Sequence, residues 1–201
     1  MTSRASFLAL GDSYTIGEGV TEAERWPTQL AHRLRAEGCD VDDPQIIATT
    51  GWTTDELADA LDAIALTPGY GLVTLLIGVN NQYRGRDAQE YRQQFHQLLE
   101  RAVALAGGHA NHVVVVSIPD WGMSRFARDN GRDADAVGRA LDYFNSLARV
   151  EATRAGAAFV DITDLSRSYP DELVDDGLHP DAQQYARWAE RIVPAALAAL
   201  D

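Results

Sequence analysis

Short apolar runs alternate along the chain with longer stretches in which apolar residues return every three or four positions. The short runs, one of which contains four consecutive valines, lack the polar alternation of a half-exposed strand. Such runs are typical of strands that are buried on both faces of a parallel sheet. They predict five strands, at residues 7–10, 45–49, 72–77, 112–118 and 158–160.

The longer stretches predict five amphipathic helices. Thr53 and Glu56 have the spacing of a capping box at the start of the second helix, and Asp87 and Glu90 repeat that spacing before the third. We expect Pro194 to bend or end the fifth helix, because an interior proline removes a backbone hydrogen bond. The apolar stripes are, in chain order, Leu30 and Leu34; Leu57, Leu61 and Ile64; Tyr91, Phe95, Leu98, Leu99 and Ala102; Val137, Leu141, Phe144 and Ala148; and Ala182, Tyr185, Ala189 and Ile192.

The regular alternation of predicted strands and helices indicates an α/β fold with a doubly wound parallel sheet of about five strands. The chain has 201 residues, which is close to the usual size of one domain. No linker, repeat or low-complexity tract divides it. We therefore expect residues 1–201 to form a single domain.

Composition excludes several classes of function. The chain has 17 basic and 30 acidic residues, and a formal net charge of −13 repels phosphate backbones, so we expect no nucleic-acid partner. Every basic residue is an arginine, and the absence of lysine excludes Schiff-base enzymes, P-loop hydrolases and Ser–Lys hydrolases. Cys39 is the single cysteine, so neither an internal disulfide nor a cysteine-rich metal site can form.

No apolar stretch approaches the roughly 18 residues that indicate a membrane span. The apolar run near the start of the sequence is also too short for a signal peptide. We therefore expect a cytoplasmic protein that does not insert stably into a membrane. The sequence gives no indication of the oligomeric state.

Polar residues and glycines follow the predicted strands and indicate a catalytic site. Ser13 follows the first strand, Gly51 the second and Asn80 the third, while Asp176 and His179 lie farther along the chain. Ligands of such sheets bind outside the carboxyl ends of the strands, at the topological switch point. A hydroxyl, a glycine amide, a carboxamide and an Asp-x-x-His pair are the parts of an acyl-transfer site.

His179 is the best candidate base because Asp176 stands three residues before it and can orient its imidazole. Asp175, four residues before the histidine, is the alternative partner. Asp175, Asp176, His179 and Asp181 could instead hold a metal ion. We interpret the other four histidines as surface or loop residues: His32, His96, His109 and His112.

Four segments, taken together, resemble the SGNH, or GDSL-type, esterase/lipase family. They are Gly11-Asp-Ser-Tyr14, Gly51, Gly78-Val-Asn-Asn81 and Asp176-Gly-Leu-His179, in the order of the family's blocks. The resemblance implies a flavodoxin-like α/β sandwich and an ester hydrolase without cofactor or metal. It implies Ser13 as nucleophile, His179 as base, Asp176 as its orienter, and an oxyanion hole from Ser13 N–H, Gly51 N–H and the Asn80 side chain. Tyr14 and Asn81 depart from the family pattern, which has leucine and aspartate there.

The substrate is less well indicated than the chemistry. Residues 119–135 form a long connection that could act as a binding loop or lid over the site. We expect substrate contacts from the following residues: Trp52, Arg84, Trp121, Met123 and Phe126. A domain of this size has little material for a deep acyl tunnel, so we expect short-chain esters as substrates.

Three alternatives remain open. The same residues could serve a lysophospholipase or thioesterase that acts on longer acyl chains, or a carbohydrate O-deacetylase. A catalytically silent ligand-binding module is the non-enzyme alternative, and labelling of an activated serine distinguishes it from a hydrolase.

Overall fold

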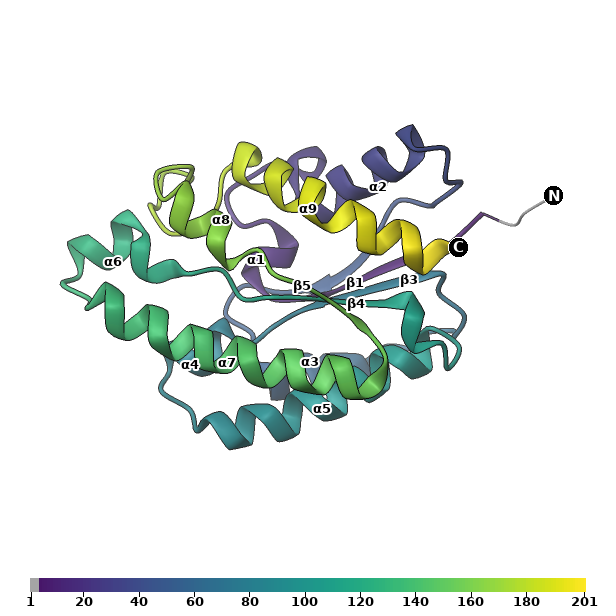
Figure 1. The fold of residues 1–201 in the computed structure, drawn as a ribbon, viewed down its shortest axis with the longest axis horizontal. Coiled ribbons are helices and arrows are strands. Elements are labelled where there is room, and N and C mark those ends of the chain that lie inside the picture. Colours follow the sequence, from purple (N-terminus) through teal and green to yellow (C-terminus); the bar gives the residue numbers. More distant parts are fainter. Residues whose placement is uncertain (1–3) are drawn as a thin grey trace.

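A five-stranded parallel sheet forms the centre of the molecule in the computed structural model, which describes residues 4–201 (Figure 1). All five predicted strands are confirmed. They are β1 (Phe7–Gly11), β2 (Gln45–Ala48), β3 (Leu72–Leu76), β4 (Val113–Val116) and β5 (Ala158–Val160). Their order is β2-β1-β3-β4-β5, and every neighbouring pair is parallel. The order reverses between β1 and β3, which is the switch point of a flavodoxin-like sheet.

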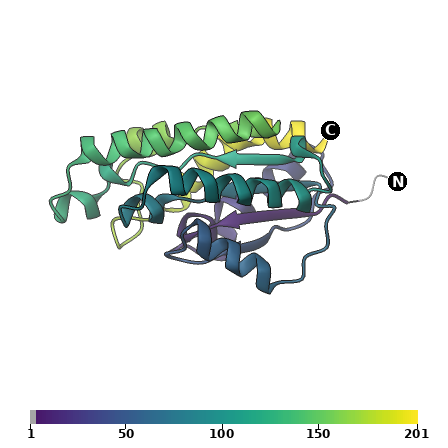
Figure 2. The same ribbon diagram turned by 90° about the horizontal axis from the view of Figure 1, so that it is seen from below.

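The five predicted helices cover the two faces of this sheet. One face carries α2 (Trp26–Ala36) and α9 (Ala182–Leu200), and the other carries α3 (Thr54–Ala63), α5 (Ala88–Leu105) and α7 (Ala134–Ala155) (Figures 1 and 2). The α2 and α9 helices lie side by side although they come from opposite ends of the sequence. Gln29 Nε2 donates to the Ala182 carbonyl at 3.1 Å, and Arg33 Nη2 donates to the Ala186 carbonyl at 3.3 Å.

The expectation that Pro194 ends or bends the fifth helix is wrong in its first part, because α9 continues through Pro194 to Leu200. Proline in a helix interior costs about 3 kcal/mol. Two positions before and after the proline, Ile192 and Ala196 are fully packed, each 0% exposed. Tertiary packing of this apolar face therefore outweighs the local preference to stop.

Residues 119–135 are not the open loop expected from the sequence. They contain a 3-10 turn, η3 (Trp121–Met123), and a short helix, α6 (Arg125–Asp129). Asp120 caps the first by accepting from Gly122 N–H, and Ser124 caps the second by accepting from Ala127 N–H. Two other short helices follow strands directly: α1 (Ser13–Ile16) and α4 (Val79–Tyr83). A further one, α8 (Thr163–Ser168), follows β5.

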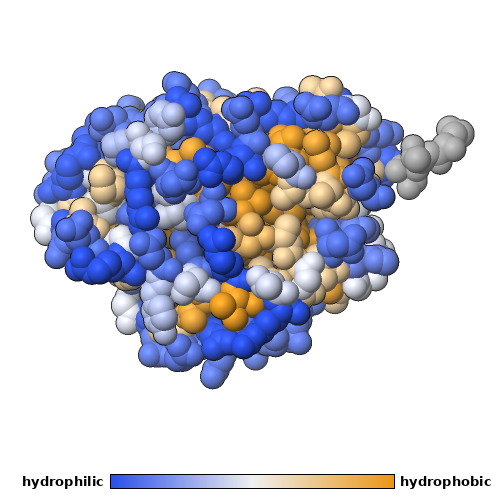
Figure 3. Space-filling view, in the orientation of Figure 1, coloured by the Kyte–Doolittle hydropathy of each residue, from blue (hydrophilic) through white to orange (hydrophobic). Residues whose placement is uncertain are grey.

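One edge of the sheet is formed by β5, whose three residues are half-buried. Apolar surface gathers on this side of the molecule, between α9 and α7 (Figure 3). The Arg149 guanidinium covers part of it, since its central carbon lies 4.4 Å from the centre of the Phe159 ring. A short edge strand with a charged side chain over it is a poor template for pairing with another chain.

Candidate active site

Ser13 lies at a sharp turn where β1 ends and α1 begins. The turn depends on Gly11, because a Cβ there would lie 2.5 Å from the Leu76 carbonyl oxygen on β3 and would also overlap the Thr15 side chain. Glycine therefore lets β1 approach its neighbours closely enough to place Ser13 at the switch point of the sheet.

Asp12 precedes this serine and is the N-cap of α1. Its Oδ1 accepts from Tyr14 N–H at 3.0 Å, while its Oδ2 is buried without a hydrogen-bond partner. The side chain is 0% exposed, and this burial raises the pKa of Asp12 to about 7 despite backbone hydrogen bonds that favour its charged form. The sequence motif gave no reason to expect a carboxyl group that titrates near neutral pH.

One cavity of about 190 Å³ brings together the residues that the sequence singled out for chemistry. Ser13, Gly51, Asn80 and His179 all line it. They come from four segments that are far apart in the sequence and meet at the carboxyl ends of the strands. This convergence was expected from the strand order of such folds.

His179 and Asp176 form a close pair on the loop that precedes α9. His179 Nδ1 lies 2.6 Å from Asp176 Oδ2, and Asp176 Oδ1 accepts the backbone N–H groups of Leu178 and His179. Partial burial opposes ionisation of Asp176, but the hydrogen bonds from His179 and Leu178 outweigh it and hold the pKa of this carboxyl below its usual value. An ionised Asp176 fixes the proton on Nδ1 and leaves Nε2 as a proton acceptor.

The alternative partner, Asp175, makes a different contact. Its backbone carbonyl accepts from Arg125 Nη2 at 2.6 Å. Asp181, a member of the alternative metal cluster, caps α9 instead by accepting from Gln183 and Gln184 N–H. Among residues 4–201, no three His, Cys, Asp or Glu side chains are arranged to hold a metal ion.

Asn80 and Gly51 supply N–H groups to the same cavity. The Asn80 amide donates one N–H to the Trp52 carbonyl at 2.9 Å, and a primary amide has a second N–H that remains for a ligand. The Gly51 backbone has φ 89°, a left-handed conformation that glycine adopts freely. These groups can donate hydrogen bonds to a developing negative charge.

Arg84 stabilises the Gly51 turn and does not line the cavity, contrary to its expected substrate contact. Its Nη2 donates to the Gly51 carbonyl at 2.6 Å, and its Nη1 lies 3.4 Å from Glu56 Oε2 on α3. The guanidinium therefore holds the turn from outside the site.

Asn81 replaces the aspartate of the family pattern and links α4 to α3. It is 0% exposed, its Oδ1 accepts from Thr54 N–H, and its Nδ2 donates to Thr54 Oγ1 at 2.7 Å. An ionised aspartate could only accept hydrogen bonds, so the amide suits this pair of contacts. Asn81 thus helps to fix the helix that carries Asn80.

Two of the five expected substrate contacts line the cavity, Trp121 and Phe126. Met123 lies beside a separate groove between η3 and α7, and the Trp52 side chain packs half-buried against the core. Tyr83 also lines the cavity, and it lies three residues after Asn80 on α4 and so shares a helix face with it. Its ring meets Trp121 edge-on, with the ring centres 5.3 Å apart.

Within residues 4–201, no helix is both long enough and apolar enough to cross a membrane.

Comparison with known proteins agrees with this arrangement. Among solved structures, TesA aligns with a TM-score of 0.74 at 20% identity, over 97% of this chain and 99% of that chain. The esterase EstA from Pseudoalteromonas sp. aligns with a TM-score of 0.71 at 18% identity, over 94% and 95%. A variant of an acetyl-xylooligosaccharide esterase from Geobacillus aligns with a TM-score of 0.74 at 17% identity, over 96% and 94%. No curated protein matches the sequence significantly.

At these identities the structural likeness establishes the fold. The family follows from the sequence, because the model of the GDSL-like lipase/acylhydrolase family matches residues 9–187, which is most of the chain. This match confirms the resemblance found in the four sequence segments. The chain therefore belongs to the GDSL-like lipase/acylhydrolase family and is an ester-cleaving hydrolase.

Proposed function

We propose that the protein is a serine esterase that hydrolyses short-chain carboxylic esters through an acyl-enzyme intermediate. The observation that carries this proposal is the single cavity that Ser13, the Asp176-paired His179, Gly51 and Asn80 line together. A serine hydroxyl is a weak nucleophile, and it needs an adjacent base that a third group orients.

In the first half-reaction, Ser13 Oγ forms a bond to the ester carbonyl carbon while His179 Nε2 takes the hydroxyl proton. The tetrahedral intermediate collapses, the bond to the alcohol oxygen breaks, and His179 returns the proton to that oxygen. Asp176 stays ionised and stabilises the imidazolium that forms between these two transfers. The negative oxygen accepts from the N–H groups of Ser13, Gly51 and the Asn80 side chain.

In the second half-reaction, water replaces the alcohol. His179 takes a proton from the water while the water oxygen bonds to the acyl carbon. The bond to Ser13 Oγ then breaks, and His179 returns the proton to the serine. The products are a carboxylic acid and the regenerated enzyme, and no cofactor is needed to balance the reaction.

The size of the cavity supports a short acyl group. An engineered apolar cavity of about 150 Å³ holds one benzene molecule, and the cavity here measures about 190 Å³. An acyl group of about six carbons occupies most of such a space, and further methylenes would remain in water, where they add nothing to binding. We expect kcat/KM for p-nitrophenyl esters to be highest between acetyl and hexanoyl. A maximum at decanoyl or beyond would favour a lysophospholipase or thioesterase.

A carbohydrate O-deacetylase is the second candidate. It is favoured by Tyr83, whose side chain is 46% exposed at the cavity and could lie against a sugar ring. The structural neighbour from Geobacillus is named as an acetyl-xylooligosaccharide esterase. Release of acetate from an acetylated oligosaccharide with a kcat/KM well above that for p-nitrophenyl acetate would support this activity over simple ester hydrolysis.

The test of the proposal is reaction with a fluorophosphonate, which labels only an activated serine, measured together with hydrolysis of p-nitrophenyl acetate. We expect the wild-type protein to be labelled, and Ser13→Ala to lose both labelling and hydrolysis. Ser146→Ala is the matched control, because Ser146 lies on the exposed surface of α7 and donates only to the Tyr143 carbonyl. Activity of Ser13→Ala within tenfold of wild type would place the nucleophile elsewhere, and an unlabelled wild-type protein would favour a silent binding module.

A further inference from the structure

The segment from Asp120 to Phe126, here called the wall segment, supplies two aromatic walls of the cavity. Trp121 and Phe126 are held on the cavity side by two contacts: Trp121 Nε1 donates to Gln82 Oε1 at 2.8 Å, and Phe126 N–H donates to the Gly177 carbonyl at 2.9 Å. Both contacts come from elements that also carry proposed catalytic groups, since Gln82 lies on α4 and Gly177 lies between Asp176 and His179. The wall segment is thus attached directly to the elements that carry the proposed catalytic groups.

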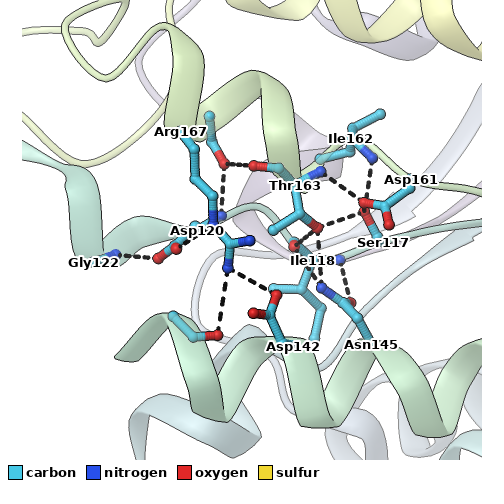
Figure 4. A network of polar contacts seen from close by, with 12 residues as sticks. Ser117, Ile118, Asp120, Gly122, Asp142, Asn145, Asp161, Ile162, Thr163 and Arg167 are labelled. Carbon is cyan, nitrogen blue, oxygen red and sulfur yellow. Dashed lines mark hydrogen bonds and ion pairs between the residues drawn. The ribbon is translucent and has the colours of Figure 1, made fainter. Parts of the chain in front are cut away.

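Asp120 anchors the wall segment on its other side (Figure 4). Its Oδ1 accepts from Gly122 N–H at 2.9 Å, and its Oδ2 lies 2.8 Å from Arg167 Nε. Its own N–H donates to Ser166 Oγ at 2.7 Å. The carboxylate side chain is only 3% exposed, so its charge depends on these partners for stabilisation.

Arg167 connects this anchor to two helices. It lies on α8, and its Nη2 donates to Asp142 Oδ1 at 2.8 Å and to the Gly138 carbonyl at 3.4 Å, both on α7 (Figure 4). Arg167 therefore joins the wall segment, α8 and α7 at one point.

Two glycines make room for this junction. A Cβ on Gly138 would lie 3.0 Å from Asp120 Oδ2, and a Cβ on Gly122 would lie 2.9 Å from Asp120 Oδ1. Gly138 stands in the interior of α7, where glycine costs about 1 kcal/mol relative to alanine. The close approach around the Asp120 carboxylate explains why glycine occupies these positions.

We propose that the Asp120–Arg167 ion pair is a positioning device that sets where Trp121 and Phe126 lie and thereby how long an acyl group the cavity accepts. The proposal rests on the esterase function argued above. Neither Asp120 nor Arg167 lines the cavity, so both are positioning residues and touch no reacting atom. Without the pair, the carboxylate of Asp120 loses its link to α8 and α7, and the wall segment is held less firmly at the end that carries Trp121. Trp121 can then move away from a longer chain.

The test is the ratio of kcat/KM for p-nitrophenyl hexanoate to that for p-nitrophenyl acetate, in wild type and in Arg167→Met. Methionine keeps part of the apolar stem and removes the charge. Each methylene that loses its contact lowers kcat/KM about fourfold, so displacement from two methylenes should lower the ratio by about 15-fold. Hydrolysis of the acetate, which lacks the four additional methylenes of the hexanoate, should stay within about threefold of wild type.

Three further variants sharpen this test. Arg191→Met is the matched control, because Arg191, like Arg167, forms an ion pair, in its case with Asp164 on α8. In the described part of the chain Arg191 makes no contact with the wall segment, so the ratio in Arg191→Met should equal that of wild type. Asp120→Asn keeps the oxygen that caps Gly122 and should lower the ratio as Arg167→Met does, even if the latter folds poorly. Arg167→Lys keeps a cation and should restore part of the ratio.

A second readout does not depend on activity. The Trp121 indole N–H resonance, identified by its loss in Trp121→Phe, should shift in Arg167→Met and stay in place in Arg191→Met. A purely structural role would lower kcat/KM for both esters equally and leave the ratio unchanged, which would overturn the proposal. Arg167→Met could instead change kcat/KM only across a series of acetate esters with different alcohols. That result would place the rings beside the alcohol and overturn the acyl assignment. If the wild type hydrolyses neither ester, the proposed function fails, and an unshifted indole resonance would then overturn the positioning role independently.

Discussion

Asp12 should make the protein less stable as the pH rises through neutrality. Burial raises its pKa to about 7 in the folded state, whereas the unfolded chain has a value of about 3.9. The folded state therefore holds a proton that the unfolded state has lost, so the contribution of Asp12 to stability is fully present below about pH 4, falls up to about pH 7 and then levels off. Between pH 5 and pH 8, the folded and unfolded states differ by about one bound proton over about two pH units. The free energy of unfolding should therefore fall by about 2.7 kcal/mol over this range.

The measurement is the free energy of urea unfolding at pH 5 and pH 8, in wild type and in Asp12→Asn. Asparagine keeps an oxygen for the Tyr14 N–H but carries no titrating proton, so the variant should lack this loss. Carboxyls with a depressed pKa, such as Asp176, contribute stability that is lost only below about pH 4.5, so they do not interfere in this window. Asp59→Asn, on the exposed face of α3, is the control and should follow wild type. A wild type whose stability stays level or rises relative to Asp12→Asn would refute the reasoning.

Further predictions concern the site and its support. Asn80→Ala should lower kcat by about 100- to 1000-fold with little change in KM, as expected for one oxyanion donor; a change in KM alone would make it a binding residue. His179→Ala should be nearly as severe as loss of the nucleophile and Asp176→Asn less so, measured as kcat/KM for p-nitrophenyl acetate, and the reverse order would contradict the proposed roles. Gly122→Ala should lower the free energy of unfolding by about 1–3 kcal/mol, because its Cβ would lie 2.9 Å from Val137 Cβ as well as from Asp120; an unchanged urea midpoint would speak against that crowding. Dialysis against EDTA should leave hydrolysis unchanged, whereas a loss that added metal restores would support the alternative metal cluster.

The strands and long helices were predictable because their apolar periodicity extends over many residues. The short helices were not, since α1, α4 and α6 have only four or five residues each and give no periodic signal. What forms α6 is a single cap at Ser124 and a backbone contact to Gly177, which is about 50 residues away in the sequence. The error at Pro194 has the opposite cause, because a strong local signal was outweighed by packing on the sheet.

The candidate site, too, was only partly predictable from the sequence. Ser13, Gly51 and Asn80 follow strands directly, so their convergence follows from the topology of a parallel sheet. Which of the expected substrate contacts line the cavity was not predictable, because the direction of a side chain on a short helix depends on backbone geometry that the sequence does not encode locally. Trp121 faces the cavity and Met123, two residues later on the same turn, faces away from it.

The pairing of α2 with α9 has a consequence for how the chain acquires its structure. Contacts such as that of Gln29 with Ala182 join residues 153 positions apart, and closing such long loops slows folding. At about 5–20 residues per second, a ribosome needs about 8–30 s to make the intervening chain, so the apolar face of α2 is translated long before its partner. The loop with Asp176 and His179 immediately precedes α9, so it is also made long after the serine turn. During synthesis the serine turn is therefore made well before the proposed base, and the proposed activity needs both segments in place.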